Sequence, residues 1–364
     1  MNQKDIIQAK CLEAIGDQKY ACAVLGTGAG KTRLGLKHMV KQFRSYSKFL
    51  VVVPKLSVKQ EWINQAREAD LQYILDRITF VTYLSLHKES FDYDYVYCDE
   101  SHNAKKKHGD WLRRYQGPVL VLTGTYPRYA SSEAGVTSAE FFPKTYEYSI
   151  KDGIADNMLN DYKIYVHMLP LSRNKNIPTR RGSMSEVDSY NMHCKSVDTA
   201  NGKSVMMKRI MRMKAMQGYE TKVLYAKRLL EQQVDKTLVF TDYTDQADRI
   251  CKYTFHSKNR FSKENFNMFL TGDINKLASV QQIAEGANIP NLKVGIITHA
   301  YANEKKLAQK IGRFLRLNPN DTSIIHILCY QNTIDVKWVK SALKDFNSKK
   351  IFKYDTSKTI GITQ

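Results

Sequence analysis

A glycine-rich turn between an apolar run and a helical pattern constrains this chain more than any other feature. The apolar run covers residues 20–25, and the turn Gly-Thr-Gly-Ala-Gly-Lys-Thr covers residues 26–32. Glycines let the backbone N–H groups of such a turn point inward at phosphate oxygens, and the helix that follows presents its positive dipole end to the same anion. Leu25 departs from the strict pattern, which has glycine at that position. The turn predicts a nucleotide-binding loop with Gly28, Gly30, Lys31 on the β- and γ-phosphates and Thr32 on Mg²⁺.

Two adjacent carboxylates, Asp99 and Glu100, follow a second apolar run at residues 93–98. At the carboxyl end of a strand, one carboxylate can hold Mg²⁺ while its neighbour polarises an attacking water. Neighbouring carboxylates also repel each other unless a cation lies between them. Together with the loop at Lys31, the pair predicts a metal site made by Asp99 and Thr32, with Glu100 acting on water.

Size and composition exclude several classes of protein. A chain of 364 residues with 43% hydrophobic residues is long enough for two domains with a core each. No apolar run approaches the roughly 20 residues that span a bilayer, and the first residues show no secretory signal. The six cysteines are scattered and favour neither a disulfide framework nor a zinc site. We expect a cytoplasmic protein, in a bacterial or phage-infected cell, without a membrane partner.

The charge is strongly and unevenly positive. Of the net +20, residues 1–150 carry +5 and residues 151–364 carry +15. An excess of this size favours binding to a polyanion through counterion release. With the nucleotide motifs present, nucleic acid is the expected partner.

Apolar runs alternate with helical patterns in both halves of the chain. In residues 1–150, strands are expected at 20–25, 48–54, 78–83, 93–99 and 118–123, with helices at 31–43 and 57–70. In residues 151–364, strands are expected at 161–170, 237–241, 266–270, 293–298 and 323–330, with helices at 245–254, 276–284, 304–314 and 336–346. Near-continuous apolar strands that alternate with helices indicate parallel sheets covered on both faces, with ligands at the carboxyl ends of the strands. We predict an α/β fold with two domains, 1–150 and 151–364.

A polar, basic insertion interrupts the second half around residues 171–215. Residues 171–205 read as a long, partly mobile loop. Residues 205–214 form a methionine-rich basic helix, whose methionines we expect to fill the core. Its lysines and arginines could face solvent or nucleic acid.

A basic helical segment near the end of the chain, residues 309–316, has the pattern Q-x-x-G-R-x-x-R. Gln309, Arg313 and Arg316 fall near one face of a helix, at i, i+4 and i+7. Guanidinium groups on one face can reach across a cleft and neutralise charge on a transferring phosphoryl group.

The order of these segments resembles that of superfamily 2 helicases and nucleic-acid translocases of the DExH kind. Residues 28–32, 99–102 and 309–316 resemble motifs I, II and VI. Residues 53–55, 81–83, 122–125 and 238–241 resemble motifs Ia, Ib, III and IV, and residues 277–280 with 285–288 resemble motif V. The resemblance covers nearly the whole chain. It implies two tandem RecA-like domains, each a parallel sheet flanked by helices, with the ATP site in the cleft between them.

The resemblance also assigns roles that the residues alone do not. Gln8 would read adenine, and Gly286 and Asn288 would complete the ATP site with Gln309, Arg313 and Arg316. His102 and Thr123 would couple the ATP site to the grip on nucleic acid. The contacts to nucleic acid would come from Lys55, Thr82, Thr241 and Ser279.

The implied function is ATP-dependent remodelling or unwinding of forked or branched DNA by a monomeric motor that uses ATP and Mg²⁺. Within the superfamily, the short chain, His102 and Gln309 look closest to compact phage DNA helicases of the UvsW-like branch-migration group. The alternatives are a DExH RNA helicase, a double-stranded DNA translocase that does not unwind, and a nucleotide-gated clamp with slow turnover. Intact Glu100 and Arg313 argue against the clamp.

Overall fold

The computed structural model describes residues 3–26, 28–101, 104–124, 126–127, 132–156, 158–180, 182–202, 204–280, 289–300, 307, 310–312, 314–315, 321–344 and 346–356. The chain divides into two compact units, Met1–Leu159 (unit 1) and Asn160–Gln364 (unit 2). No helix in these described ranges is long and apolar enough to cross a membrane.

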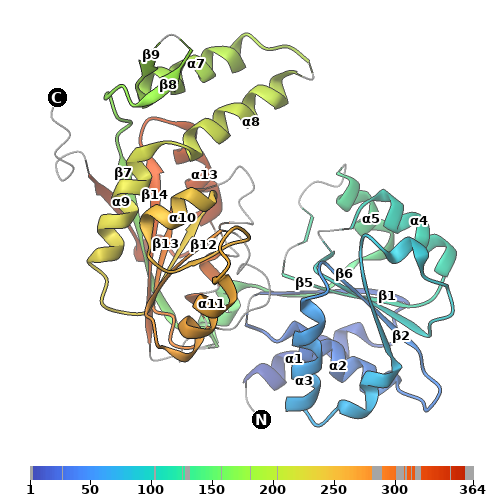
Figure 1. Ribbon diagram of the computed structural model, residues 1–364. Coiled ribbons are helices and arrows are strands. Elements are labelled where there is room, and N and C mark those ends of the chain that lie inside the picture. Colours follow the sequence, from blue (N-terminus) through green and yellow to red (C-terminus); the bar gives the residue numbers. More distant parts are fainter. Residues whose placement is uncertain are drawn as a thin grey trace. The chain divides into compact units, whose positions relative to one another are not determined.

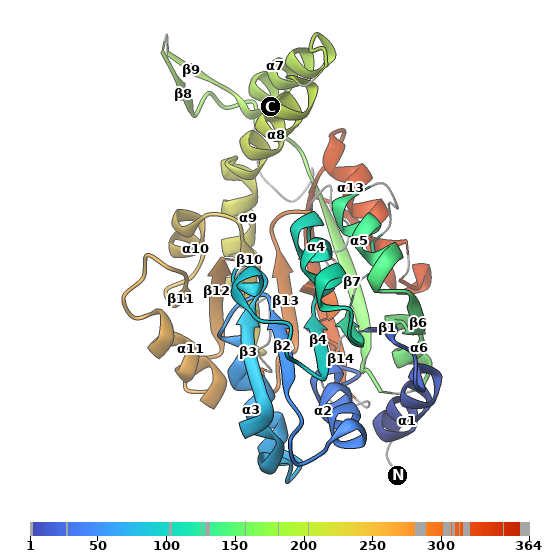
Figure 2. The same ribbon diagram turned by 90° about the vertical axis from the view of Figure 1, so that its right-hand side faces the viewer.

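Unit 1 is a parallel sheet of six strands in the order β3-β2-β4-β5-β1-β6 (labelled between Figures 1 and 2). Its strands are β1 (Tyr20–Leu25), β2 (Phe49–Val53), β3 (Ile78–Thr82), β4 (Tyr95–Asp99), β5 (Val119–Thr123) and β6 (Lys144–Tyr148). The first five were expected from the sequence, because both faces of each central strand are apolar and buried. The polar strand β6, at the sheet edge, was not.

Helices cover both faces of the unit 1 sheet. They are α1 (Gln3–Ile15), α2 (Lys31–Gln42), α3 (Val58–Glu68), α4 (Lys106–Tyr115), α5 (Glu133–Phe141) and α6 (Ile150–Ala155), with short 3₁₀ turns η1 (Gln72–Arg77) and η2 (Leu86–Lys88). One core lies between the sheet and α1, α2 and α3, and a second lies between the sheet and α4 and α5 (Figure 1). This is the sheet covered on both faces that the sequence predicts.

The division between the units falls after Leu159, whereas we expected a boundary at 150/151. The intervening residues fold back on unit 1. The hydroxyl of Tyr148 donates to Asp156, and Leu159 packs so closely on Gly153 that a Cβ there would lie 2.9 Å from the leucine side chain.

Unit 2 is a parallel sheet of seven strands in the order β11-β12-β10-β13-β14-β7-β15. The strands are β7 (Asp161–Leu169), β10 (Thr237–Thr241), β11 (Thr254–Phe255), β12 (Lys276–Val280), β13 (Val294–Ile297), β14 (Thr322–Tyr330) and β15 (Ile351–Asp355). The flanking helices are α9 (Glu220–Glu231), α10 (Thr244–Ile250), α11 (Ser262–Thr271) and α13 (Ile334–Leu343), and the 3₁₀ turn η5 (Ser348–Lys350) precedes β15. Two parallel-sheet α/β units confirm the predicted fold class.

The secondary structure predicted for two segments of unit 2 was wrong. Residues 266–270, expected as a strand, lie in α11, because Asn265 and Phe269 are buried at helical spacing and Gly272 ends the helix in the left-handed conformation (φ 95°). Residues 276–280, expected as the start of a helix, form β12, whose three central residues are all buried. Small residues in β12 weakened the apolar signal that marks a central strand.

The basic insertion is an ordered arm rather than the expected loop. It consists of a hairpin, β8 (Ile177–Thr179) and β9 (Gly182–Met184), and two helices, α7 (Glu186–Asp198) and α8 (Ser204–Gln217), which pack side by side beyond the unit 2 sheet (Figures 1 and 2). The expectation that its methionines fill the core was wrong, since the side chains of Met206 and Met207 are 72% and 60% exposed.

Candidate active site

The predicted phosphate loop joins β1 to α2. Gly26 N–H donates to the carbonyl of Tyr148 at 2.7 Å, which fixes the start of the loop, while Thr27 lies outside the described residues. Gly28 and Gly30 adopt φ angles of 92° and 77°, which non-glycine residues rarely adopt, and Gly30 caps the N-terminus of α2. Lys31 and Thr32 therefore begin the helix, at the carboxyl edge of the sheet.

Gln8 lies against this loop from α1. Its Nε2 donates to the carbonyls of Ala29 at 3.2 Å and Gly30 at 3.3 Å, and the side chain is 2% exposed. A Cβ at position 30 would lie 2.6 Å from the same nitrogen. In this structure Gln8 braces the loop backbone, and its reading of adenine stays a prediction.

Asp99 ends β4 as a buried carboxylate. Its Oδ2 accepts the indole N–H of Trp62 at 3.3 Å, and its backbone carbonyl accepts the hydroxyl of Tyr83 at 2.9 Å. Burial and the neighbouring Glu100 raise the pKa of Asp99 above its usual range, against the opposing effect of Lys31. A buried carboxylate in this position gains from a nearby cation.

Glu100 connects three of the predicted motifs. Its Oε1 lies 3.5 Å from Lys31 Nζ, and its Oε2 accepts from Thr123 Oγ1 and from the N–H of Gly124, both at 3.4 Å. Its φ of 52° is unusual for a residue with a side chain, and such backbone conformations cluster at functional sites. The structure thus brings together Lys31, Glu100 and Thr123, which the sequence separates by up to 92 positions.

The donor set fits a Mg²⁺ ion. No group of three His, Cys, Asp or Glu side chains gathers among the described residues. Mg²⁺ does not require one, because in nucleotide sites it uses one or two protein oxygens together with phosphate oxygens and water. The carboxylate of Asp99, at the end of β4, and the hydroxyl of Thr32, at the start of α2, would be the protein ligands.

Lys55 and Thr82 lie at the same carboxyl edge of the unit 1 sheet. Thr82 is the last residue of β3 and pairs with Val53 at the end of β2, and Lys55 follows two residues later. Lys55 is exposed, whereas the Thr82 hydroxyl lies 3.0 Å from that of Ser85. Their contact with nucleic acid stays a prediction.

Thr241 is the last residue of β10, and Ser279 is the last but one of the neighbouring strand β12. Both are buried. The hydroxyl of Thr241 donates to the carbonyl of Tyr243 at 3.2 Å, and the hydroxyl of Ser279 has no hydrogen-bond partner in the described part of the chain. Neither hydroxyl is open to solvent here, and both assignments stay predictions.

Six predicted site residues lie outside the described residues: His102, Gly286, Asn288, Gln309, Arg313 and Arg316. Some residues next to Gln309, Arg313 and Arg316 are described. Leu307, Ile311, Phe314 and Leu315 are buried at helical spacing, and a Cβ at Gly295 of β13 would lie 2.4 Å from the Phe314 ring. The Phe314 ring therefore packs on β13 of the unit 2 sheet.

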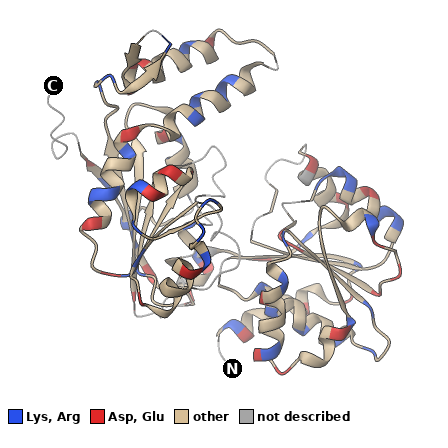
Figure 3. Ribbon diagram, in the orientation of Figure 1, with Lys and Arg blue, Asp and Glu red and all other residues tan. Residues whose placement is uncertain are grey.

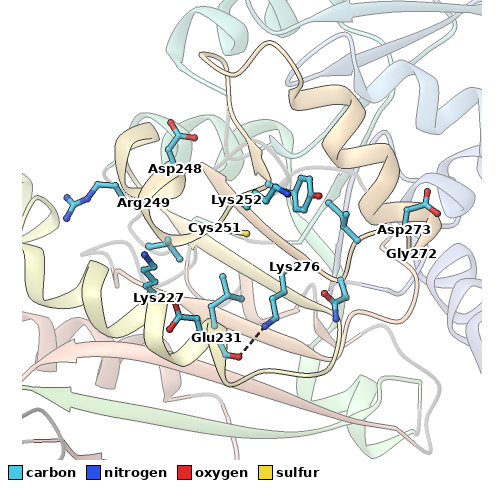
Figure 4. A pocket seen from close by; sticks show the side chains of 14 residues that line it. Lys227, Glu231, Asp248, Arg249, Cys251, Lys252, Gly272, Asp273 and Lys276 are labelled. Atoms are coloured by element: carbon cyan, nitrogen blue, oxygen red, sulfur yellow. Dashed lines mark hydrogen bonds between the residues drawn. The ribbon is translucent and has the colours of Figure 1, made fainter.

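An open pocket of about 830 Å³ lies elsewhere on unit 2 (Figure 4). It is lined by the end of α9, by the end of α10 with the residues that follow it, and by the residues that lead into β12. There Lys276 Nζ donates to the carbonyl of Glu231. Burial raises the pKa of the Cys251 thiol in its wall, so this thiol is not an activated nucleophile. The pocket contains none of the predicted site residues.

Two protein-family models match the chain, one in each unit. Residues 2–128 match the type III restriction enzyme res subunit, and residues 221–318 match the helicase conserved C-terminal domain. Together they span more than half of the chain and contain the Lys31–Glu100 site and the basic segment at 309–316. The chain belongs to the superfamily 2 helicases and translocases.

A relative and two solved structures extend this comparison. The chain is 22% identical to the DNA 3'-5' translocase XPB2 of Sulfurisphaera tokodaii, over 88% of this chain and 80% of that protein. Its fold is similar to that of the DNA-bound type ISP restriction-modification enzyme LlaBIII, with a TM-score of 0.63, 12% identity and coverage of 98% of this chain but only 31% of that one. It is also similar to S. cerevisiae Dbp5 bound to RNA and ADP BeF3, with a TM-score of 0.61, 12% identity and coverage of 97% and 90%.

Helicases and translocases of superfamily 2 are ATP-driven, nucleic-acid-dependent ATPases. Sequence reasoning on this superfamily 2 chain missed Trp62 and Tyr83, which hold Asp99 from α3 and from the turn after β3. No motif covers Trp62, and the motif Ib resemblance of residues 81–83 gives Tyr83 no link to Asp99, because each side chain acts through a tertiary contact that local spacing does not encode. Gly124 carried a partial signal, since it lies next to Thr123 in the expected motif III.

Proposed function

We propose that this protein hydrolyses ATP to translocate along DNA and to remodel or unwind it. The observation that carries the proposal is the meeting of Lys31, Glu100 and Thr123 at one edge of the unit 1 sheet, in a chain of the superfamily 2 helicases. Lys31 comes from the phosphate loop, Glu100 from the acidic pair and Thr123 from the end of β5, and these segments are far apart in the sequence. Their side chains match the tasks of triphosphate cleavage.

Each side chain has a task in this proposal. Asp99 and Thr32 would hold a Mg²⁺ ion, which would supply positive charge beside the triphosphate. Lys31 would neutralise the β- and γ-phosphate oxygens, and Glu100 would orient the attacking water and accept its proton. The hydroxyl of Thr123 donates to Glu100. It would therefore link the position of the Glu100 carboxylate to the end of β5, where Thr123 lies. Arg313 and Arg316 of unit 2 would complete the site when the two units close.

DNA is the proposed track. XPB2 of Sulfurisphaera tokodaii, which resembles most of this chain, is by its name a DNA translocase. The positive charge supports a polyanionic track, and Figure 3 shows Lys and Arg recurring along the arm helix α8. That helix contains Lys208, Arg209, Arg212 and Lys214 and no acidic residue. We propose that the arm contacts the phosphate backbone, which gives affinity without sequence preference.

Forked or branched DNA is the proposed substrate of a monomeric enzyme, similar to the UvsW-like group. The support is the sequence resemblance in motifs II and VI, at His102 and Gln309. The test is steady-state ATPase activity at fixed low salt with single-stranded, forked, branched and duplex DNA and with RNA. Strongest stimulation by forked or branched DNA is expected, and stimulation by RNA alone would contradict the choice of DNA.

Translocation on duplex DNA without strand separation is the second candidate. The name of XPB2, a DNA 3'-5' translocase, favours it. The two candidates differ in one assay. A duplex translocase displaces the third strand of a triplex and leaves a fork intact, whereas a helicase separates the fork.

A further inference from the structure

Aromatic side chains form a row across the outer edge of the unit 2 sheet. We call Tyr165, His167, His326, Phe352 and Tyr354 the aromatic ladder. Tyr165 of β7 pairs directly with His326 of β14 on one side and with Phe352 of β15 on the other, and Tyr354 pairs with His167. Directly paired residues of neighbouring strands point to the same face of a sheet, so all five rings share one face.

The rings of the ladder contact one another. The centroids of Tyr165 and His326 lie 5.4 Å apart with planes inclined by 23°, and those of His167 and Tyr354 lie 5.8 Å apart at 18°. The Phe352 ring lies 5.3 Å from that of Tyr165. These are stacked or tilted arrangements of the kind that aromatic pairs prefer.

One end of the ladder is fixed and the other is open. Both ring nitrogens of His167 form hydrogen bonds: Nδ1 with the hydroxyl of Tyr225 in α9, at 2.8 Å, and Nε2 with His326 Nδ1, at 2.9 Å. Burial lowers the pKa of His167 to about 4 and that of His326 to about 3, so both rings are neutral at physiological pH. At the other end, the side chains of Phe352 and Tyr354 are 40% and 50% exposed on the last strand of the sheet.

The surroundings of the open end are basic. Lys163, two residues before Tyr165 on the same face of β7, is exposed. Residues 344–355, which lead into and form β15, contain four lysines and two aspartates. Asp161, at the start of β7, is paired with Lys350. Exposed rings among lysines complement an anionic ligand that also has flat apolar faces.

We propose that the open end of the aromatic ladder binds single-stranded nucleic acid by stacking bases on Phe352 and Tyr354. This inference rests on the proposed function, because a motor on nucleic acid brings a strand to its own surface. Aromatic rings beside a basic surface are the means by which single-strand binders hold bases of any sequence. The ladder would hold a strand on unit 2 away from the carboxyl edge of its sheet, where Thr241 and Ser279 lie.

The test compares the native protein with the F352A/Y354A variant. Affinity is measured by fluorescence anisotropy for a labelled oligothymidine, for a strand of equal length with abasic sites at its centre, and for a matched RNA. The abasic strand keeps the phosphates and lacks the bases, so it separates stacking from charge. We expect F352A/Y354A to bind the base-bearing strands about 10-fold more weakly or worse, and to lose the preference for bases over abasic sites.

Three controls define the result. The F352Y/Y354F variant keeps both rings and should keep the native preference for bases. Tyr46→Ala removes a ring that is 72% exposed on unit 1 and should change nothing. Circular dichroism and thermal unfolding of F352A/Y354A should show a folded protein at the temperature of the binding assay, with a Tm lowered by the loss of the ring contacts with Tyr165 and His167.

Unchanged binding by F352A/Y354A would overturn the inference, as would a native protein that binds abasic and base-bearing strands equally. A native dimer that the double substitution makes monomeric would also overturn it, because the face would then be covered by a second copy. The proposed function fails differently. It is contradicted when no nucleic acid stimulates the native ATPase, whereas failure of the ladder alone leaves that stimulation intact.

Discussion

A buried ion pair at the base of the arm gives a quantitative prediction. Lys222 of α9 and Asp335 of α13 are 1% and 2% exposed, and Lys222 Nζ lies 2.6 Å from Asp335 Oδ2. The same oxygen accepts the N–H of Tyr330, at 3.0 Å, and the ammonium group lies 4.6 Å from the centre of the Tyr330 ring. Lys222→Met keeps most of the side-chain volume and removes the positive charge, which leaves the Asp335 carboxylate buried without its cation.

We expect this change to destabilise unit 2 by about 3–5 kcal/mol, the range observed when one partner of a buried pair is removed. With a urea dependence of about 2–3 kcal/mol per molar, the unfolding midpoint would fall by roughly 1–2.5 M. Asp335→Asn in the Lys222→Met background should recover part of the loss, because it removes the unpaired charge.

Trp338 makes the measurement specific to unit 2. It lies in α13, three residues after Asp335, and the other two tryptophans, Trp62 and Trp111, belong to unit 1. With 5-fluorotryptophan labelling, ¹⁹F spectra in a urea series report the two units separately. The Trp338 signal should lose its native position at lower urea while the other two keep their midpoints.

A matched substitution controls for loss of a lysine from the same helix. Lys227→Met removes an exposed lysine from α9 and should alter stability by less than about 0.5 kcal/mol. A Trp338 midpoint that moves no further in Lys222→Met than in Lys227→Met would refute the reasoning, since the pair would then contribute no more than a surface charge.

Three further predictions concern the loop, the basic segment and acid stability. Gly30→Ala should abolish ATP binding measured by calorimetry while circular dichroism stays native, because a Cβ there would lie 2.6 Å from Gln8 Nε2 at a φ of 77°; normal binding would show that the loop tolerates the change. Arg313→Ala should lower ATP turnover on the order of 10³-fold when its guanidinium acts on the transferring phosphoryl group, and a change of a few fold would leave it no such role. Burial lowers the pKa of His38 and of His167 to about 4 from 6.5, so the unfolded chain binds more protons below pH 6.5; calorimetric Tm should therefore fall from pH 6.5 towards 4 and change little above 7 on their account, and a Tm that is constant down to pH 4.5 would contradict this.

The sequence predicts the fold where burial follows a simple pattern. The central strands of unit 1 are apolar on both faces, so runs such as residues 49–53 mark them without ambiguity. In unit 2 the signal is weaker. The strand β12 contains small residues and the helix α11 contains phenylalanines, which is the opposite of the compositions typical of strands and helices. Only burial in the tertiary structure decides which segment is the strand and which is the helix.

The arm shows a different limit of sequence reasoning. Its polar composition is typical of a loop, but α7 begins with a capping box at Ser185 and Asp188. The carboxylate of Glu186 is buried and accepts from Ser172 N–H and from both the N–H and the hydroxyl of Thr221. These contacts with the start of α9 fix the arm to unit 2, and they join residues that are 35 positions apart in the sequence.

The motifs of the site could be predicted from the sequence, but the residues that hold those motifs in place could not. The loop at Lys31 and the acidic pair are local patterns whose chemistry follows from their residue types. The bracing of the loop by Gln8 and the hold of Trp62 on Asp99 depend on how α1 and α3 pack, which no spacing in the chain reveals.

The central claim is that the Lys31–Glu100 site hydrolyses ATP in response to nucleic acid. The most direct measurement is the DNA-stimulated ATPase rate of Glu100→Gln and Lys31→Ala beside Glu13→Gln, which changes an exposed glutamate of α1. Glu100→Gln should retain ATP binding and lose at least about 100-fold in turnover, Lys31→Ala should lose both, and Glu13→Gln should match the native protein. Native turnover in Glu100→Gln or Lys31→Ala would contradict the account.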